Sequence, residues 1–252
     1  MTNRSARRPS WDAGATWRIG CTVVSILLIE TTVCAAAAFP VVLPWIEVTA
    51  SIAPDSGTRA VVFSVMLVPS YVAFALCLMV ASASGTRITG ARTPPNAEMP
   101  IAEMGWPLMR WARYMVASHI VRVFAGSLFR GSPIWTVYLR LNGARIGRRA
   151  YVNTLFISDH NLLDIGDDVV IGSEVHLSGH TVEAGVVKTG TVRLGHGVTI
   201  GLGTVVDIGV IVGAGCQVGA LSLIPKHTTL EGGAIYAGIP IHRIDGRSAA
   251  GM

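Results

Sequence analysis

Residues 194–230 read LGHGVTIGLGTVVDIGVIVGAGCQVGALSLIPKHTTL and follow a six-residue rule. One position in six is aliphatic, and the position four residues after it is always small or β-branched. A fixed internal repeat of this kind outweighs every other structural signal in a sequence. The aliphatic positions are Leu194, Ile200, Val206, Val212, Val218, Ile224 and Leu230, and the second series is Val198, Thr204, Val210, Cys216, Ser222, Thr228 and Ala234.

The repeat predicts short parallel strands wound into a column. One inward aliphatic side chain per strand fills a narrow prism, and the glycines that follow four of the aliphatics allow the backbone to turn. Three hexads make one coil, and stacked coils pair about 4.8 Å apart. A helix is excluded, because each repeated glycine would cost about 1 kcal/mol relative to alanine. We expect an all-β parallel β-helix of four to five coils over residues 136–244, followed by a tail at 245–252.

The N-terminal half has a different composition. The whole chain is 51% hydrophobic and 14% charged, whereas about a quarter of a typical soluble chain is charged. Residues 19–46 are apolar except for Glu30, and residues 60–83 carry no charge. Each stretch reaches the roughly 20 residues that cross a bilayer core. We therefore expect an N-terminal tail at 1–18, a two-helix transmembrane hairpin at 19–83 and a linker at 84–135.

The flanking charges predict the orientation of this hairpin. The positive-inside rule places both of its ends in the cytoplasm, which gives a multi-pass cell-membrane protein with a cytoplasmic β-helix. A cleaved signal peptide is the alternative for the first stretch, although its apolar part exceeds the usual 7–15 residues. The flanking residues are Arg4, Arg7, Arg8 and Arg18 before the first stretch and Arg87 and Arg92 after the second.

Two further features of this half are open to interpretation. Residues 104–130 read as a helix with five aromatic side chains among four arginines, which suits the depth of lipid headgroups, so we expect an interfacial helix. Glu30 is either a functional intramembrane carboxylate or a protonated side chain that is hydrogen-bonded to Ser64 or Ser70 of the second stretch.

The charge and cysteine content argues against nucleic-acid binding and against a fold held by disulfides or zinc. The net charge of +5 comes from 18 arginines and two lysines, without a dense basic run, and the C-terminal half has few aromatic residues, so no nucleic-acid partner is expected. The four cysteines show neither a CxxC motif nor a Cys/His spacing, which excludes a disulfide framework and a zinc knuckle. We expect no metal site and no tightly bound cofactor.

The hexads resemble the hexapeptide-repeat acyltransferase superfamily, and this resemblance implies that the parallel β-helix is left-handed. Gly238-Ile-Pro-Ile-His-Arg243 resembles the closing G-x-P-A-K element of that superfamily, with departures at Ile241 and Arg243. Asp164-Ile-Gly-Asp-Asp168 and Gly190-Thr-Val-Arg-Leu-Gly195 are similar to the membrane-embedded C-terminal regions of nonribosomal-peptide-synthetase-like proteins of the epsilon-poly-lysine synthetase type. The chain resembles one helix-pair-plus-β-helix unit of those proteins, without an adenylation or carrier domain.

A break in the repeat marks the candidate active site. Shortly after His180, five residues beginning at Glu183 interrupt the hexads, and loops on a rigid scaffold often carry function. Acyl transfer to a hydroxyl or amine needs a base with a pKa near 7, which histidine supplies. The resemblance implies this role for His180, and Glu183 is near enough in sequence to orient its imidazole. His160 is the second candidate, with Asp159 and Asn161 expected to line the same cleft and bind substrate.

The resemblance also implies where the acyl donor binds. In the superfamily, coenzyme A lies in a groove between neighbouring β-helices and contacts their last coils. This implies a homotrimer, a donor that is acyl-CoA or a carrier-bound acyl thioester, and a synthetase or carrier protein as a partner. The implied donor-binding residues are Gly219, Ala220, Gly238 and Arg243, the last as a phosphate contact.

The sequence thus leads to one main function and two alternatives. The main one is a membrane-anchored acyltransferase that moves an acyl or aminoacyl group from a thioester to a hydroxyl or amine, with His180 as general base. The first alternative is a non-catalytic β-helix scaffold that assembles at the membrane. A gamma-class carbonic-anhydrase-like metal enzyme is less favoured, because His176, His180 and His196 occupy different hexad phases and cannot stack in one column.

Overall fold

The structure, a computed structural model, describes residues 13–52 and 55–244. It opens with a hairpin of two long helices, α1 (Ala13–Ile52) and α2 (Ser56–Ile88), both long and apolar enough to cross a membrane. They extend beyond the expected range of 19–83 on both sides. Asp55 caps α2, because its carboxylate accepts a hydrogen bond of 2.8 Å from the backbone N–H of Thr58. Most of the expected tail at 1–18, and all of the tail at 245–252, lies outside the described residues.

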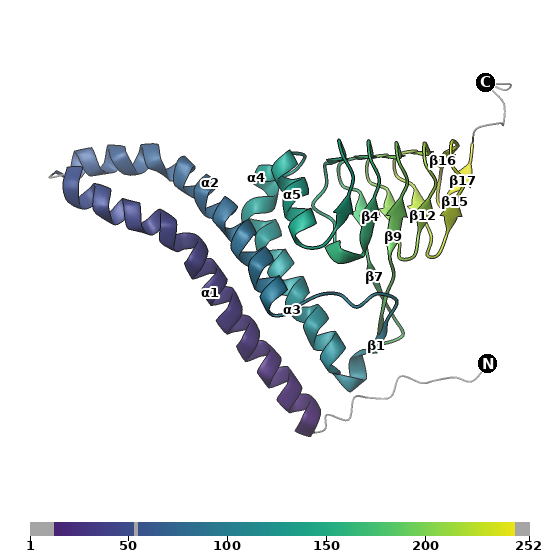
Figure 1. Cartoon of the computed structure of the whole chain (residues 1–252), viewed down its shortest axis with the longest axis horizontal. Helices are drawn as coiled ribbons and strands as arrows, with labels where there is room; N and C mark the ends of the chain where they lie inside the picture. Colours follow the sequence, from purple (N-terminus) through teal and green to yellow (C-terminus); the bar gives the residue numbers. More distant parts are fainter. Residues whose placement is uncertain (1–12, 53–54, 245–252) are drawn as a thin grey trace.

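A third helical layer lies between this hairpin and the β-helix (Figure 1). Its main helix, α3, buries Leu108, Tyr114 and Val121 and contacts both α1 and α2. It therefore packs against protein on several sides, and the location of residues 104–130 at a membrane surface stays a prediction. The elements of this region are β1 (Glu98–Pro100), η1 (Ile101–Glu103), α3 (Trp106–Val121), the π-helix η2 (Arg122–Gly126), α4 (Ser127–Phe129) and α5 (Pro133–Leu141).

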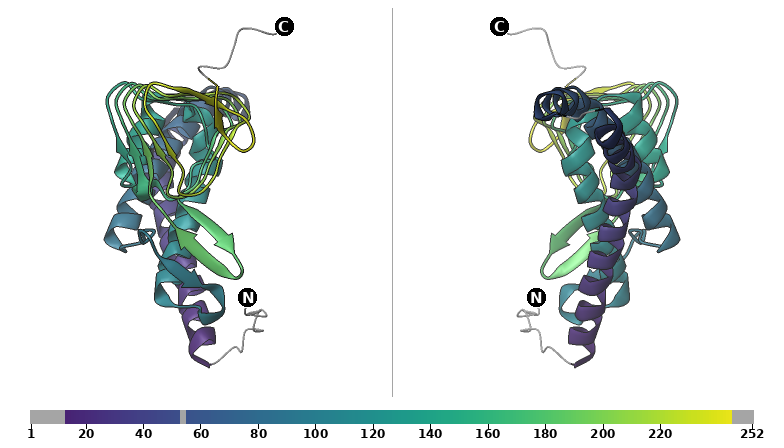
Figure 2. Two further views of the ribbon diagram at one scale, coloured as in Figure 1. Left: turned by 90° about the vertical axis from the view of Figure 1, so that its right-hand side faces the viewer. Right: turned by 90° about the vertical axis from the view of Figure 1, so that its left-hand side faces the viewer.

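Three parallel sheets then form a column of stacked coils, as Figure 2 shows from one end. The left-handed parallel β-helix expected from the sequence is confirmed. The first sheet contains β2 (Arg145–Ile146), β4 (Leu163–Ile165), β9 (Val192–Leu194), β12 (Ile211–Val212) and β15 (Thr229–Leu230). The second contains β3 (Tyr151–Val152), β5 (Val170–Ile171), β10 (Thr199–Ile200), β13 (Gln217–Val218), β16 (Ile235–Ala237) and the antiparallel β17 (His242–Arg243). The third contains β6 (His176–Leu177), β11 (Val205–Val206) and β14 (Leu223–Ile224).

The hexad rule predicts the core of this column correctly. Leu194, Val212 and Leu230 lie opposite one another in adjacent strands, so they form one interior row. All seven aliphatic positions of residues 194–230 are buried. The coils approach so closely at their corners that a Cβ at Gly201 would lie 2.5 Å from the backbone nitrogen of Ala220. Only glycine fits such a position.

Two interruptions of the repeat lie at one corner of the column, the one after His180 and a shorter one between Ile157 and Leu177, which are paired 20 positions apart. Ile165 pairs with Leu194, which lies 29 positions later, whereas Leu194 pairs with Val212, which lies 18 positions later. The additional residues form a hairpin of β7 (His180–Glu183) and β8 (Val186–Thr189), which projects from the column (Figure 2). β1 joins this hairpin as a third, antiparallel strand. The other interruption contains η3 (His160–Leu162). We call residues 158–162 and 178–190 the insertion corner.

Candidate active site

A histidine and a carboxylate meet at the insertion corner. Nδ1 of His180, at the start of β7, lies 2.6 Å from Oδ2 of Asp159. Asp159 is 21 residues earlier in the chain, but the stacking of one coil on the next brings the two together. The Asp159 side chain has no exposed surface, whereas 20% of the His180 side chain is exposed. The corner therefore holds a buried anion against a histidine that solvent can reach.

The second oxygen of Asp159 is held by residues from outside the β-helix. The hydroxyl of Thr93 donates a hydrogen bond of 2.6 Å to Oδ1, and the indole Nε1 of Trp111 in α3 donates another of 3.1 Å. Burial by itself would raise the pKa of Asp159, but the hydrogen bonds from His180 and Thr93 and the charge of His180 hold it below its ordinary value. Asp159 is thus ionised near neutral pH although it is buried.

The imidazole of His180 is fixed on more than one side. Its ring meets the Trp111 ring edge to face, with the centroids 5.0 Å apart. Ser158 Oγ lies 3.5 Å from its Nδ1, and Ser178 holds the His180 main chain through a hydrogen bond of 2.5 Å from its hydroxyl to the carbonyl. When Nδ1 donates its hydrogen to Asp159, Nε2 carries the lone pair, and no hydrogen bond from the described residues reaches Nε2. The arrangement leaves one ring nitrogen able to accept a proton.

His160, the second candidate base, lies in the interior. Its ring meets the rings of Tyr114 and Tyr138 edge to face, each at 5.8 Å, and only 2% of the residue is exposed. Burial lowers the pKa of His160 to about 4, so the imidazole is neutral near pH 7. Its Nδ1 is buried without a hydrogen-bond partner among the described residues.

The expectation that Glu183 orients His180 is wrong. The Glu183 carboxylate forms ion pairs with Lys188, at 3.8 Å, and with Lys226. The physical reason is strand geometry, because residues three positions apart in β7 point to opposite faces. The orienting carboxylate is Asp159 instead.

The two expected substrate contacts are also engaged with protein. Asp159 was expected to contact substrate, but both of its oxygens are hydrogen-bonded to His180, Thr93 and Trp111. The Asn161 amide donates a hydrogen bond of 2.8 Å to the Thr93 carbonyl and accepts one of 3.3 Å from the Thr93 backbone N–H. Asn161 therefore fixes the segment that supplies the Thr93 hydroxyl.

The four expected donor-binding residues lie elsewhere on the column. Gly219 and Ala220 form the corner between β13 and β14, and Gly238 follows β16. The two segments of the insertion corner instead precede β4 and β9. Arg243 in β17 lies 3.4 Å from the Glu231 carboxylate. Within one chain, the described residues therefore do not bring this group together with His180.

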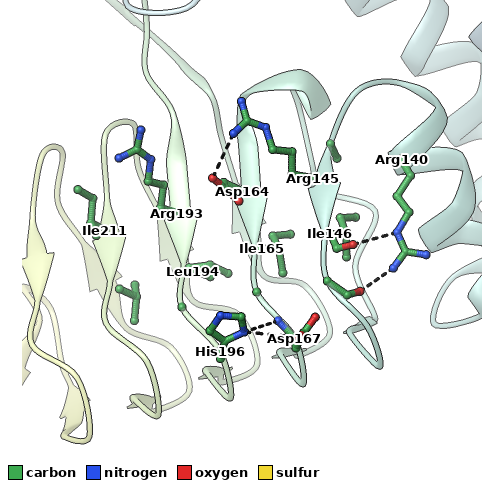
Figure 3. Close-up of a pocket in the computed structure, with 15 residues that line it drawn as sticks. Arg140, Arg145, Ile146, Asp164, Ile165, Asp167, Arg193, Leu194, His196 and Ile211 are labelled. Atoms are coloured by element: carbon green, nitrogen blue, oxygen red, sulfur yellow. Dashed lines mark hydrogen bonds and ion pairs between the residues drawn. The ribbon is translucent and has the colours of Figure 1, made fainter.

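A shallow groove of about 710 Å³ covers the outer face of β2, β4, β9 and β12 (Figure 3). Arg145 lies 3.7 Å from Asp164 there, and Arg140 donates to the carbonyls of Ile146 and Gly147. His196 also lines this groove and accepts a hydrogen bond of 3.0 Å from the backbone N–H of Asp167. Arg145 thus pairs with a side chain, whereas Arg140 and His196 bind main-chain groups, and none of the three belongs to the insertion corner.

The remaining histidine of the carbonic-anhydrase alternative, His176, packs against Phe156 with ring centroids 4.5 Å apart. The described residues contain no group of three His, Cys, Asp or Glu side chains that could hold a metal ion. His176, His180 and His196 thus contact three different sets of neighbours, in line with their different hexad phases.

Sequence reasoning missed Thr93 and Trp111. Thr93 precedes two prolines in the linker, and Trp111 is one of five aromatic residues in the helical stretch. Neither has a local signal that relates it to the β-helix. Both act through contacts between residues 48 or more positions apart, which follow from how α3 docks against the column.

No family model matches the chain. A curated relative, the delta-poly-L-ornithine synthetase of Acinetobacter baumannii, is 27% identical over 136 residues, which is 54% of this chain and 10% of that protein. The chain therefore spans about a tenth of the length of this relative.

Solved structures of hexapeptide-repeat acetyltransferases are also similar. One from Vibrio cholerae is 22% identical, covers 41% of this chain and 62% of its own, and gives a TM-score of 0.37. A maltose O-acetyltransferase from Clostridium difficile is 21% identical, with coverages of 41% and 59% and a TM-score of 0.35. A galactoside acetyltransferase in complex with coenzyme A is 23% identical, with coverages of 44% and 68% and a TM-score of 0.36. The proteins found are thus of the two kinds that the sequence resembles, hexapeptide-repeat acyltransferases and a synthetase of the poly-amino-acid type.

Proposed function

We propose that the protein is a membrane-anchored acyltransferase that moves an acyl or aminoacyl group from a thioester to a hydroxyl or amine. The observation that carries this proposal is the hydrogen bond between Nδ1 of His180 and the buried carboxylate of Asp159. A histidine that is oriented by a carboxylate, with its second nitrogen available, is the arrangement of a general base. The similar acetyltransferases, and the coenzyme A in one of them, support a thioester donor.

The proposed reaction follows from this geometry. Nε2 of His180 takes the proton from the acceptor hydroxyl or amine as the acceptor oxygen or nitrogen attacks the thioester carbonyl. Asp159 stabilises the imidazolium that forms, and Trp111 and Thr93 keep the carboxylate in place. When the carbon–sulfur bond breaks, the imidazolium returns the proton to the leaving thiolate. The products are the acylated acceptor and a free thiol, and His180 is neutral again.

The cellular setting is part of the proposal. Two long apolar helices support insertion in a membrane, and we propose that the β-helix lies on the cytoplasmic side. Since Gly219, Ala220, Gly238 and Arg243 lie apart from His180 within one chain, we propose a homotrimer in which these residues meet the insertion corner of a neighbouring copy. The donor is acyl-CoA or a carrier-bound thioester, delivered in the second case by a synthetase or carrier protein.

The direct test is thiol release by the detergent-purified full chain with acyl-CoA and aminoacyl-carrier donors and with hydroxyl and amine acceptors. We expect His180→Ala to lower the rate by about 10²- to 10⁴-fold, the usual contribution of a general base. The matched control is His176→Ala, since His176 packs on Phe156 away from Asp159 and should keep the full rate. If no donor reacts faster with the natural chain than with His180→Ala, the protein is a scaffold and not an enzyme.

A further inference from the structure

A cavity of about 300 Å³ lies beside the insertion corner, between α3 and the first coil of the β-helix. Its apolar wall includes Leu155 and Ile157. Its polar groups come from Ser158 and His160 on one side and from α3 and the first residue of η2 on the other. Ligand sites in proteins are typically apolar clefts of this size with a few polar groups. We call it the α3 cavity.

His160, which lines the α3 cavity, has an unsatisfied polar atom. Among the residues that the structure describes, Nδ1 of His160 has no hydrogen-bond partner, although the ring is enclosed by Tyr114 and Tyr138. A buried polar atom without a partner costs free energy, so native proteins seldom retain one without a reason. Because His160 also lines the cavity, a bound molecule can supply the missing hydrogen bond.

The cavity also carries a positive charge. Arg122, the first residue of η2, lines the cavity and donates a hydrogen bond of 2.7 Å to Nδ1 of His119. No carboxylate of the described residues lies within the 4.0 Å of an ion pair with Arg122, whereas Arg130 and Arg149 each have such a partner. A half-buried guanidinium without a protein anion is suited to a carboxylate or phosphate of a ligand.

The α3 cavity adjoins the His180 site, because α3 and Ser158 contribute to both places. Trp111 contacts Asp159 and His180, and Met115 and Ser118, which follow it at helical spacing, line the cavity. Ser158 joins the two places, because it lines the cavity and its Oγ lies 3.5 Å from Nδ1 of His180. From Trp111 to Arg122 the helix axis advances about 16 Å.

We propose that the α3 cavity binds the acceptor substrate through an anionic group, a carboxylate or phosphate, that pairs with Arg122. This rests on the proposed function, and it adds the chemical class of the acceptor. The reacting hydroxyl or amine lies at His180, the apolar middle of the molecule lies against Leu155 and Ile157, and the anion lies at Arg122. The acceptor is therefore an extended amphipathic molecule and not a single free amino acid.

The test measures binding separately from catalysis. Full-length protein labelled at the histidine Cε1 carbons is titrated in detergent, and the His160 signal is assigned by its loss in His160→Phe. One pair of probes is 8-aminooctanoate and its neutral amide. The other pair is dihexanoylphosphatidate and dihexanoylphosphatidylcholine. This second pair tests whether the anion is a lipid phosphate. We expect a saturable shift of the His160 signal and about tenfold tighter binding of the anionic member of at least one pair.

Variants of two arginines decide the role of the charge. Arg122→Gln should remove the preference for the anion, and Arg122→Lys should keep part of it. Arg110→Gln on the exposed side of α3 should leave the preference intact. Equal binding of the charged and neutral members in both pairs, or an unchanged preference in Arg122→Gln, would overturn the proposal. Arg122-dependent binding in a protein that consumes no thioester would instead reject the acyltransferase and leave the anion site standing.

Discussion

Asp159 accepts a hydrogen bond of 2.6 Å from His180, and its carboxylate is buried whereas the imidazole is partly exposed. We expect Asp159→Asn to lower kcat by about 100-fold or more with little change in KM, because an amide cannot stabilise the imidazolium. The measurement is the steady-state rate of thiol release. Glu183→Gln is the matched control and should change kcat by less than about threefold, since Glu183 pairs with lysines. Equal losses in the two variants would assign the orienting role to neither residue.

Trp111 supplies a hydrogen bond to Asp159 and an aromatic contact to His180. Trp111→Phe removes the N–H donor and keeps a ring, so we expect kcat to fall by about tenfold, which corresponds to one hydrogen bond to a charged group. Trp106→Phe, at the exposed start of α3, is the comparison variant and should retain the natural rate. If the two variants have the same rate, the indole does not contribute to the site.

The buried His160 makes stability depend on pH. Its pKa is about 4 in the folded chain and about 6.5 when unfolded, so between these values the unfolded chain binds more protons and stability rises with pH. We expect a stability loss of about 3 kcal/mol as the pH falls from 6.5 to 4. The lowered pKa of Asp159 also stabilises the folded chain, but in a different pH range. This stabilisation is present above a pH of about 4 and is lost at lower pH.

The check is the midpoint of thermal unfolding of the natural chain and of His160→Phe at pH 7, 6, 5 and 4. The variant should show a smaller decrease between pH 6.5 and 4. Parallel curves for the two proteins would mean that His160 is protonated without cost in the folded state.

Glu30 faces α3 and not the expected serines. Ser64 donates to the Ala60 carbonyl and Ser70 accepts from Trp45, whereas Glu30, Ser82 and Arg113 line one narrow cavity among α1, α2 and α3. Glu30 Oε2, Ser82 Oγ and Arg113 Nε are buried there without a hydrogen-bond partner among the described residues. Two buried polar side chains that share a cavity should be coupled in their effect on stability.

We therefore expect the destabilisation by Glu30→Gln and Arg113→Gln together to be smaller than the sum of the single effects, by about 1–3 kcal/mol. The measurement is a double-mutant cycle of unfolding free energies in detergent. The control cycle combines Glu30→Gln with Arg110→Gln at an exposed position. The two effects should be additive. Additivity in both cycles would show that Glu30 and Arg113 act independently.

The parts of the molecule that local periodicity controls could be predicted from the sequence. Each hexad specifies its own inward side chain, so the row of Leu194, Val212 and Leu230 was correctly predicted, and the break after His180 indicated the corner of interest. The partner of His180 could not be found in this way. Glu183 is near in sequence but on the opposite face of its strand, whereas Asp159 is brought near by coil stacking, which a linear pattern does not encode.

The helical layer was predicted less well for a related reason. The apolar stretches indicated α1 and α2, but the aromatic and arginine content of residues 104–130 suits a membrane surface and a protein interior equally well. Only the docked structure shows that Trp111 and Tyr114 face the insertion corner, where they contact Asp159 and the backbone of His160.

The pairing of β1 with β8 and the contact from Thr93 to Asp159 have a consequence for protein engineering. The stacked coils can be exchanged as a rigid block, but the environment of the buried carboxylate is assembled from chain that precedes them. A chimera that joins a foreign anchor directly to Arg145 would inherit the column and lose two donors to Asp159. The smallest fragment that keeps the hydrogen-bond donors to Asp159 therefore begins before Thr93 and includes α3.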